Sequence, residues 1–462
     1  MYYFMKRIAY LRVLVIAAVL GLAMPMSAQF LRTGYFMDGS NRMQLNPANL
    51  PSRGYLDVPA LGTLNVGAYT NSLGLNDLIN TFDSDGDFWD NPDFYNKLKV
   101  ANNLGVSLST DIISFGFYRG KNFWSANVGV RLDVEAGIPR NMFDYLRESP
   151  DDMDDLSGWN GRNDRISDLN LGLNAFTEVG VGYARIVNDR LTVGGKFNVL
   201  LGVGNLDMNI NNIQITSNEL YDNYGNINYD AEATIDVDAS LEANMKGLEL
   251  TTDQDGVIDG VEMNGFGIGG YGVGIDLGAT YRLLDNLTVS AAVTDLGFIS
   301  WSKGSSTVVE GDNTQTYNGN NVGEFLDRVD GGEVIDFDMF GLQKGNVQKK
   351  RSTRLPTTLT VGAEYGFWKN RFSVGALSTT RWGMYRTLSE LTLSANFRPA
   401  RAIGLSASYS MLQSAGKTFG AAVKLGPLTI GTDYLFLGKN TRSVNVFMGI
   451  SMGLGKTRPE VD

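Results

Sequence analysis

The feature that most constrains the fold is a strict alternation of apolar with small or polar residues near the C-terminal end. Along 443–454, one face of an extended chain carries Val444, Val446, Met448, Ile450, Met452 and Leu454. The opposite face carries Ser443, Asn445, Phe447, Gly449, Ser451 and Gly453. Side chains of a β-strand point alternately to its two faces, so this period of two predicts strand and not helix. The same pattern recurs at 358–367 and 403–411.

The alternating segments are long. Candidate strands lie at 61–72, 103–119, 121–136, 174–187, 190–204, 267–284, 286–301, 355–367, 370–380, 385–398, 401–412, 416–425, 427–437 and 442–454. Strands of soluble sheets average about 5 or 6 residues, whereas a tilted membrane-spanning strand needs about 9 to 11. The set has fourteen members, an even number, as expected of a bacterial single-chain barrel.

The connections between the predicted strands differ in length on the two sides. Tight turns at 119–122, 188–190, 284–286, 368–370, 399–400 and 426–427 are separated by long segments at 73–102, 137–173, 205–266 and 302–354. Outer-membrane barrels have short periplasmic turns and longer extracellular loops, whereas a soluble β-sandwich has no reason to sort its loops in this way. We therefore predict an all-β fold, a transmembrane antiparallel β-barrel of about fourteen strands with long extracellular loops.

Two features of composition agree with a barrel. The chain has 55 glycines in 462 residues, and 11% of its residues are aromatic. Glycines serve curvature and close packing in barrels, and aromatic residues form girdles at both membrane interfaces. If the tight turns lie on the periplasmic side, Trp124 and Trp368 would lie at the periplasmic ends of strands, and Trp301 and Trp382 at the extracellular ends.

The N-terminus has the pattern of an export signal. Lys6, Arg7 and Arg12 precede a short apolar run at 13–22, and Met26-Ser27-Ala28 offers a cleavage site before Gln29. A single-pass anchor is the alternative, but the run is short for one, since a spanning helix needs about 20 apolar residues. We expect a signal peptide at 1–28, a barrel at 61–454 and a periplasmic tail at 455–462.

Several kinds of chemistry are excluded or disfavoured by composition. The chain has no cysteine and no histidine, so neither a thiolate site nor a Ser-His-Asp triad can be built. The net charge of −11 disfavours a nucleic-acid partner. We expect no enzymatic activity and no cofactor.

The segment before the first predicted strand contains Asn46-Pro47-Ala48. Asn-Pro alone is a common turn initiator. Behind a signal peptide and before fourteen strands, however, the triplet resembles the long-chain fatty-acid transporter superfamily of outer-membrane barrels, most closely an uncharacterised Bacteroidota branch known as a domain of unknown function. In that superfamily the triplet belongs to an N-terminal plug, here residues 29–60.

The resemblance implies a location and two alternative functions. The location is the outer membrane of a Gram-negative bacterium, in contact with lipid and lipopolysaccharide. The first function is an uptake channel for small hydrophobic molecules. The second is a non-transporting platform, such as a type IX secretion accessory, that binds partners through the long loops. The sequence names neither a ligand nor a protein partner.

Charged residues fall on the predicted inner faces of several strands. They are Arg131, Asp133, Glu135, Glu178, Lys196, Asp276, Glu364, Lys424 and Asp433. Paired carboxylates can carry out glycoside hydrolysis. A polar lumen holding water or a plug explains the same residues without catalysis, and this is the interpretation we favour.

Three other stretches have a less specific pattern. Asp253, Asp255, Asp259 and Glu262, around Gly256, match part of a calcium-binding loop, but the first position is Thr251 and the flanks look like strands, so we favour an acidic hairpin turn over a metal site. Lys344, Lys349, Lys350, Arg351 and Arg354 could meet lipopolysaccharide phosphates or form a solvated loop. Short helices are expected at 143–147 and 322–329.

Overall fold

A computed structural model describes most of the chain. It covers residues 31–74, 91–148, 160–219, 232–252, 256–318, 343–345, 350–412, 417–435 and 442–459, and the single positions 77, 228 and 230. Among these residues no helix has the length and apolar character needed to cross a membrane, a finding that does not bear on strands.

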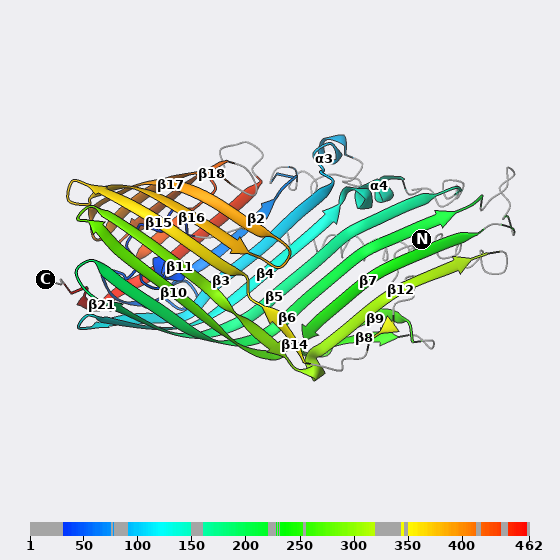
Figure 1. The fold of residues 1–462 in the computed structure, drawn as a ribbon, viewed down its shortest axis with the longest axis horizontal. Helices are drawn as coiled ribbons and strands as arrows, with labels where there is room; N and C mark the ends of the chain where they lie inside the picture. Colours follow the sequence, from blue (N-terminus) through cyan, green and yellow to red (C-terminus); the bar gives the residue numbers. More distant parts are fainter. Residues whose placement is uncertain are drawn as a thin grey trace.

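The described strands close into one antiparallel barrel with fourteen wall positions, as the sequence predicts (Figure 1). Two positions are each shared by two short strands: β1 (Arg53–Asp57) with β2 (Leu64–Thr70), and β14 (Arg351–Arg354) with β15 (Thr357–Phe367). The others are β3 (Ala101–Arg119), β4 (Asn122–Pro139), β5 (Asn163–Ile186), β6 (Leu191–Ser217), β10 (Gly270–Leu284), β11 (Leu287–Trp301), β16 (Phe372–Trp382), β17 (Thr387–Ala400), β18 (Ile403–Leu412), β19 (Thr418–Leu425), β20 (Leu428–Thr432) and β21 (Ser443–Thr457).

The ring closes where the last strand, β21, pairs with β1 and β2. The wall therefore runs from Arg53 to Thr457, which is slightly wider than the expected 61–454. Closure leaves the barrel without a free sheet edge, and this is a requirement for any β-structure that spans a bilayer.

Burial in this barrel is the reverse of that in a soluble protein. On β21 the polar Ser443 and Asn445 are buried on the inner face, whereas the apolar Val446, Met452 and Leu454 are exposed on the outer face. The wall of β15 repeats this, with Thr360 buried and Val361 exposed. An apolar exterior around a polar interior is the arrangement of a transmembrane barrel, and it confirms the predicted fold class.

The two ends of the barrel differ as expected. At one end, which we call the tight-turn end, Gly120 and Gly426 adopt positive φ values of 62° and 60° in two-residue hairpin turns. Such turns favour glycine, because a Cβ atom disfavours this backbone region. In Figure 1 the tight turns lie at the left, where β21 also ends.

At the opposite end, which we call the long-loop end, the wall is very uneven in height. β5 and β6 have 24 and 27 residues, against 11 each for β15 and β16. The lower part of β6 pairs with β10, and the upper part pairs with β7 (Ala233–Met245), which pairs in turn with β12 (Ser306–Tyr317). These strands form a sheet that runs beyond the barrel toward the right of Figure 1.

This projecting sheet corrects the expectation that 205–266 and 302–354 are loops. Besides β7 and β12 they contain the hairpin of β8 (Leu248–Thr252) and β9 (Ile258–Met263), the two-residue strand β13 (Gln343–Lys344) and the 3-10 turn η4 (Lys303–Ser305). The prediction assigned these stretches to loops because they are rich in acidic and amide residues. β7 nevertheless keeps a period-two pattern, in which the buried Ile235 and Val237 alternate with Asp236 and Asp238.

Among the described residues helices are few and short. α3 (Pro92–Tyr95) and α4 (Arg140–Glu148) lie side by side at the long-loop end, where Phe94 and Phe143 pack together. α4 confirms the helix expected at 143–147, whereas 322–329 lies outside the described residues. Trp124, Trp368 and Trp382 are exposed near strand ends. Trp301 is not: it is fully buried against Phe176 and Leu200, so its expected place in an outer girdle is wrong.

Candidate functional site: a plugged lumen

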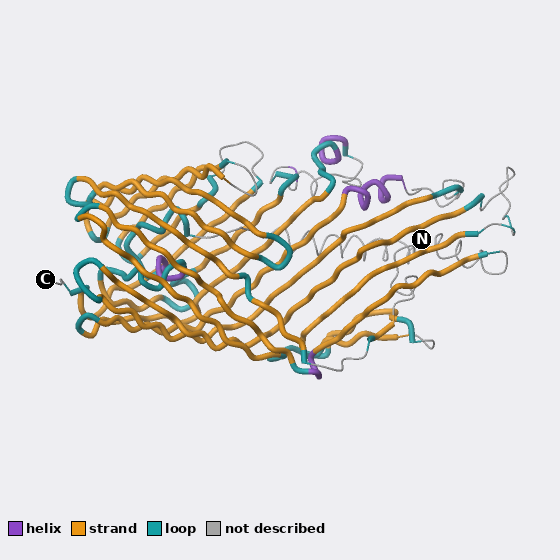
Figure 2. The backbone as a smooth tube through the Cα atoms, in the orientation of Figure 1, coloured by secondary structure: helices purple, strands orange, loops and turns teal. Residues whose placement is uncertain are grey.

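Residues 31–52, which we call the plug segment, lie inside the barrel, where Figure 2 shows the 3-10 turn η1 (Asn41–Gln44) enclosed by strands. Their hydrogen bonds reach wall strands around the ring. Thr33 bonds to Asp433 beside β20 at 2.7 Å, Tyr35 to Ser290 of β11 at 2.9 Å, and Gln44 to Asp111 of β3 at 3.2 Å. The lumen is therefore occupied and not open.

The strongest single contact of the plug segment is a buried ion pair. The Arg32 guanidinium lies 2.6 Å from a carboxylate oxygen of Glu390 on β17, and both side chains are almost completely buried. Arg32 also donates to Thr392 and Ser410, each at 3.0 Å, and Tyr434 donates to Glu390 at 2.8 Å. Burial works to lower the pKa of Arg32, but Glu390 and Tyr434 outweigh it and raise that pKa above its usual value.

The Asn46-Pro47-Ala48 triplet forms a tight turn pressed against the wall. The Asn46 side-chain oxygen accepts from the Ala48 backbone N–H at 2.9 Å, and its amide donates to Ala279 O of β10 at 3.4 Å. The triplet is thus a turn initiator and a wall contact at once.

Two wall glycines make room for this triplet. A Cβ atom at Gly278 would lie 2.1 Å from the Asn46 side-chain oxygen, and one at Gly194 would lie 2.6 Å from the Pro47 carbonyl. Other inward glycines serve the plug in the same way: a Cβ at Gly375 would lie 2.4 Å from Phe36 and one at Gly420 would lie 2.3 Å from Thr33. Part of the high glycine content is therefore explained by space for the plug.

Valine at position 278 is expected to unseat the triplet, because the side chain would overlap the Asn46 amide and no rotamer removes its Cβ. The matched control is Gly195→Val, whose Cβ would have no neighbour closer than 3.4 Å. Ion conductance of the purified proteins in planar bilayers checks this. G278V should conduct at least several times more than wild type, and G195V should not. Equal conductance of all three proteins would contradict the view that Gly278 makes room for the Asn46-Pro47-Ala48 triplet.

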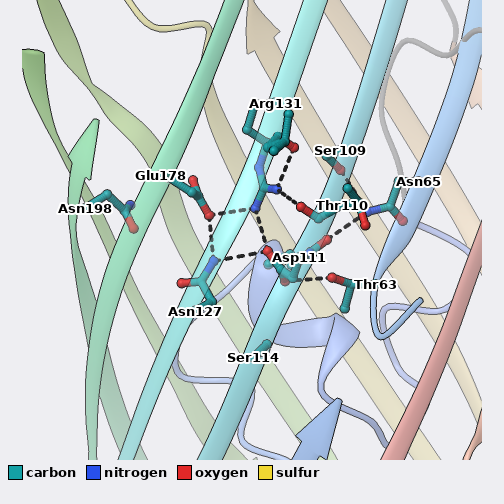
Figure 3. A network of polar contacts seen from close by, with 12 residues as sticks. Thr63, Asn65, Ser109, Thr110, Asp111, Ser114, Asn127, Arg131, Glu178 and Asn198 are labelled. Carbon is teal, nitrogen blue, oxygen red and sulfur yellow. Dashed lines mark hydrogen bonds and ion pairs between the residues drawn. The ribbon is translucent and has the colours of Figure 1, made fainter. Parts of the chain in front are cut away.

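On the long-loop side of the plug segment, charged side chains form a layer within the lumen (Figure 3). Glu178 of β5 accepts from Arg131 of β4 at 2.7 Å, from Lys196 of β6 at 3.0 Å and from Asn127 at 2.8 Å. Arg131 also lies 3.3 Å from Asp111, which accepts from Thr63 at 2.6 Å. We call Asp111, Arg131, Glu178 and Lys196 the central charged layer.

Contacts also cross the lumen from one wall to the other. β4 and β16 stand nearly opposite in the ring, yet Arg381 of β16 lies 2.6 Å from Asp133 of β4. The turn after β16 reaches the same wall, where the backbone N–H groups of Met384 and Tyr385 donate to Glu135 at 3.1 and 3.0 Å. These contacts narrow the lumen on the long-loop side of the plug segment.

All nine charged residues named from the sequence are placed on the inner side. Besides those above, Asp276 accepts from Asn198 at 3.1 Å, Glu364 pairs with Arg398 at 2.6 Å, and Lys424 pairs with Asp38 at 3.4 Å. Sequence reasoning missed the inner residues Arg32, Asp111, Asp295, Arg381 and Glu390. For Glu390 a signal existed, because it shares the polar face of its strand with Thr392, Ser394 and Asn396.

The cavity left between the plug segment and the central charged layer is small. Its volume is about 140 Å³. Leu31, Met43, Leu45, Pro47 and Leu355 line it on the apolar side, and Asp111, Arg131, Glu178, Lys196 and Asp276 on the polar side. Ligand pockets typically measure about 300–1,000 Å³, so this space holds a few water molecules and not a drug-sized molecule.

The remaining candidate sites add no chemistry to the lumen. Asp253, Asp255 and the side chain of Asp259 lie outside the described residues, and Glu262 is exposed on the β8–β9 hairpin. In the described part, no group of three or more acidic side chains is placed to share a metal ion. Of the basic cluster, Lys349 lies outside the described residues and Arg351 pairs with Glu242 at 3.1 Å.

Fold and site together define a transmembrane β-barrel with an internal plug. The chain belongs to a family of unknown function, DUF5723, whose sequence profile matches residues 47–433. This confirms the expected membership of an uncharacterised domain-of-unknown-function family. No curated protein matches the chain.

Solved structures of similar shape include two toluene transporters. The chain is 11% identical to the Ralstonia pickettii toluene transporter TbuX, with 89% of this chain and 93% of that chain covered and a TM-score of 0.42. It is 12% identical to the P. putida toluene transporter TodX (94% and 98% covered, TM-score 0.39) and 12% identical to a Pseudomonas aeruginosa FadL homologue (93% and 96% covered, TM-score 0.39). No function is transferred at these values.

Proposed function

We propose that the protein is an outer-membrane channel for small hydrophobic molecules, closed at rest by its plug segment. The observation that carries the proposal is a plug bonded to wall strands around the ring of a closed barrel, while the barrel itself does not depend on the plug for its strand pairing. A segment held by side-chain contacts can leave its seat without breaking the wall. The tight-turn end then faces the periplasm and the projecting sheet faces outward.

The preference for hydrophobic molecules is supported by the lining of the central cavity. Leu31, Met43 and Leu45 of the plug segment supply an apolar side, and the central charged layer supplies a polar one. A small molecule with an apolar body and a polar end complements both sides. Because the resting cavity is only about 140 Å³, such a molecule passes only after the plug has moved.

Uptake by whole cells tests this function. Cells that express the wild-type protein should accumulate a labelled medium-chain fatty acid or labelled toluene several times faster than cells of a deletion strain. A labelled hydrophilic sugar of similar mass is the control, and its uptake should be the same in both strains. Equal uptake of all hydrophobic probes would reject the channel.

That negative outcome would favour the second candidate, a non-transporting interaction platform. The observation behind it is the sheet of β5, β6, β7 and β12, which extends well beyond the barrel on the proposed outer side (Figure 1). A channel function requires the lumen alone and does not explain why the strands on one side extend so far beyond the barrel. The platform proposal therefore assigns partner binding to this sheet.

A further inference from the structure

A second cavity opens in the mouth of the lumen at the tight-turn end. Its volume is about 440 Å³, about three times that of the central cavity. The turns after β10, β15 and β17 form its sides, the plug segment contributes Asp38, Arg42, Leu50 and Ser52, and the end of β21 contributes Thr457 and Arg458. This cavity lies apart from the charged layer described above.

Basic side chains outnumber acidic ones around this cavity. The basic residues are Arg42, Arg398, Arg401, Lys424 and Arg458, and the acidic residues are Asp38, Asp285 and Glu364. Two of the acids are already engaged, since Glu364 pairs with Arg398 at 2.6 Å and Asp38 pairs with Lys424 at 3.4 Å. For Arg42, Arg401 and Arg458 no carboxylate of the described residues lies within ion-pair distance.

Two of these three arginines are held in place by weak contacts. Arg42 donates to Asn49 at 3.3 Å, and its buried Nε has no hydrogen-bond partner. Arg458 donates to Thr192 at 3.3 Å. Five basic side chains against three acidic ones leave the mouth with a surplus of positive charge, which an anion would relieve.

We propose that Arg42, Arg401 and Arg458 form a phosphate-binding site in this mouth. The surplus of two positive charges matches the charge of about −1.5 to −2 that a phosphate monoester carries at pH 7. Arginine suits phosphate because its planar fork donates two parallel hydrogen bonds. A phosphate held here would join the plug segment, the turn after β17 and the end of β21. The site does not depend on transport, so it stands or falls separately from the channel.

Calorimetric titration of the full-length folded protein in non-ionic detergent, at low salt, tests the site with inorganic phosphate and with glycerol 3-phosphate. We expect wild type to bind at least one of them. R42Q and R458Q should each bind about tenfold more weakly or worse, because each removes charge-assisted hydrogen bonds. R371Q, an exposed arginine of the neighbouring turn that does not line the cavity, should bind as wild type does. Heat-modifiability gels establish that every variant is a folded barrel.

The source of the phosphate is distinguished in nanodiscs of phosphatidylglycerol. If a lipid headgroup fills the site, added inorganic phosphate should no longer bind there, whereas an unchanged titration would identify free phosphate as the ligand. Both results support the site. Absence of binding in detergent, or wild-type affinity in both R42Q and R458Q, would overturn it.

Discussion

The Arg32→Ala variant is expected to conduct ions through a lumen that the wild-type protein keeps closed. The substitution leaves Glu390 buried without its cation, and breaking a buried pair on one side costs about 3–5 kcal/mol. This cost falls on the seated state of the plug alone, because the strand pairing of β17 is untouched. It corresponds to about two to four orders of magnitude in the ratio of unseated to seated plug. Single-channel recording in planar bilayers measures this ratio directly.

Two further variants separate loss of the ion pair from general damage. In Arg32→Met combined with Glu390→Leu no charge is left unpaired, so the lumen should close again. Arg190→Ala removes an exposed ion pair, in which Arg190 lies 3.8 Å from Asp189. Conductance should not change, because surface ion pairs contribute little. If R32A conducted as little as wild type, then the ion pair would not be what retains the plug.

The membrane-spanning part of the fold could be predicted because lipid imposes a simple rule. Every strand in the bilayer must show an apolar side outward, so alternation such as Val444, Val446 and Met448 is unbroken along β21. The projecting sheet needs no lipid-facing side, yet β7 still alternates: Ile235 and Val237 are buried on one face, and Asp236 and Asp238 lie on the other. That strand was therefore predictable from its sequence. β12 is mostly polar, and its pairing with β7 defines it.

The plugged site was predictable in part, for a related reason. Inward polar residues such as Glu178 and Lys196 follow from strand alternation alone, but their partners depend on register between strands, which the sequence does not state. Arg32 and Glu390 lie far apart in the chain, and nothing local to either one points to the other. Gly194 and Gly278 show only a missing side chain on the inner face, and the plug that needs the space lies elsewhere in the sequence.

Replacing Glu178 with alanine is expected to have the largest effect on the wall itself. Glu178 is buried and accepts from Arg131 at 2.7 Å and from Lys196 at 3.0 Å. Its loss leaves two partly buried cations, Arg131 with only the more distant Asp111 and Lys196 with no ion-pair partner among the described residues. The expected loss of unfolding free energy is about 3–5 kcal/mol, the usual cost of an uncompensated buried charge. Urea unfolding in detergent, followed by tryptophan fluorescence and by heat-modifiability gels, measures it.

Charge balance, and not shape, is the cause proposed for this loss, and a second substitution tests that cause. Adding Lys196→Met to E178A removes one of the two stranded cations, so the double variant should regain a large part of the lost stability although it has two substitutions in place of one. Glu262→Ala, on the exposed face of the β8–β9 hairpin, should unfold as wild type does. If E178A alone matched wild type within about 0.5 kcal/mol, the range of ordinary surface changes, water would have to reach the central charged layer in the folded barrel.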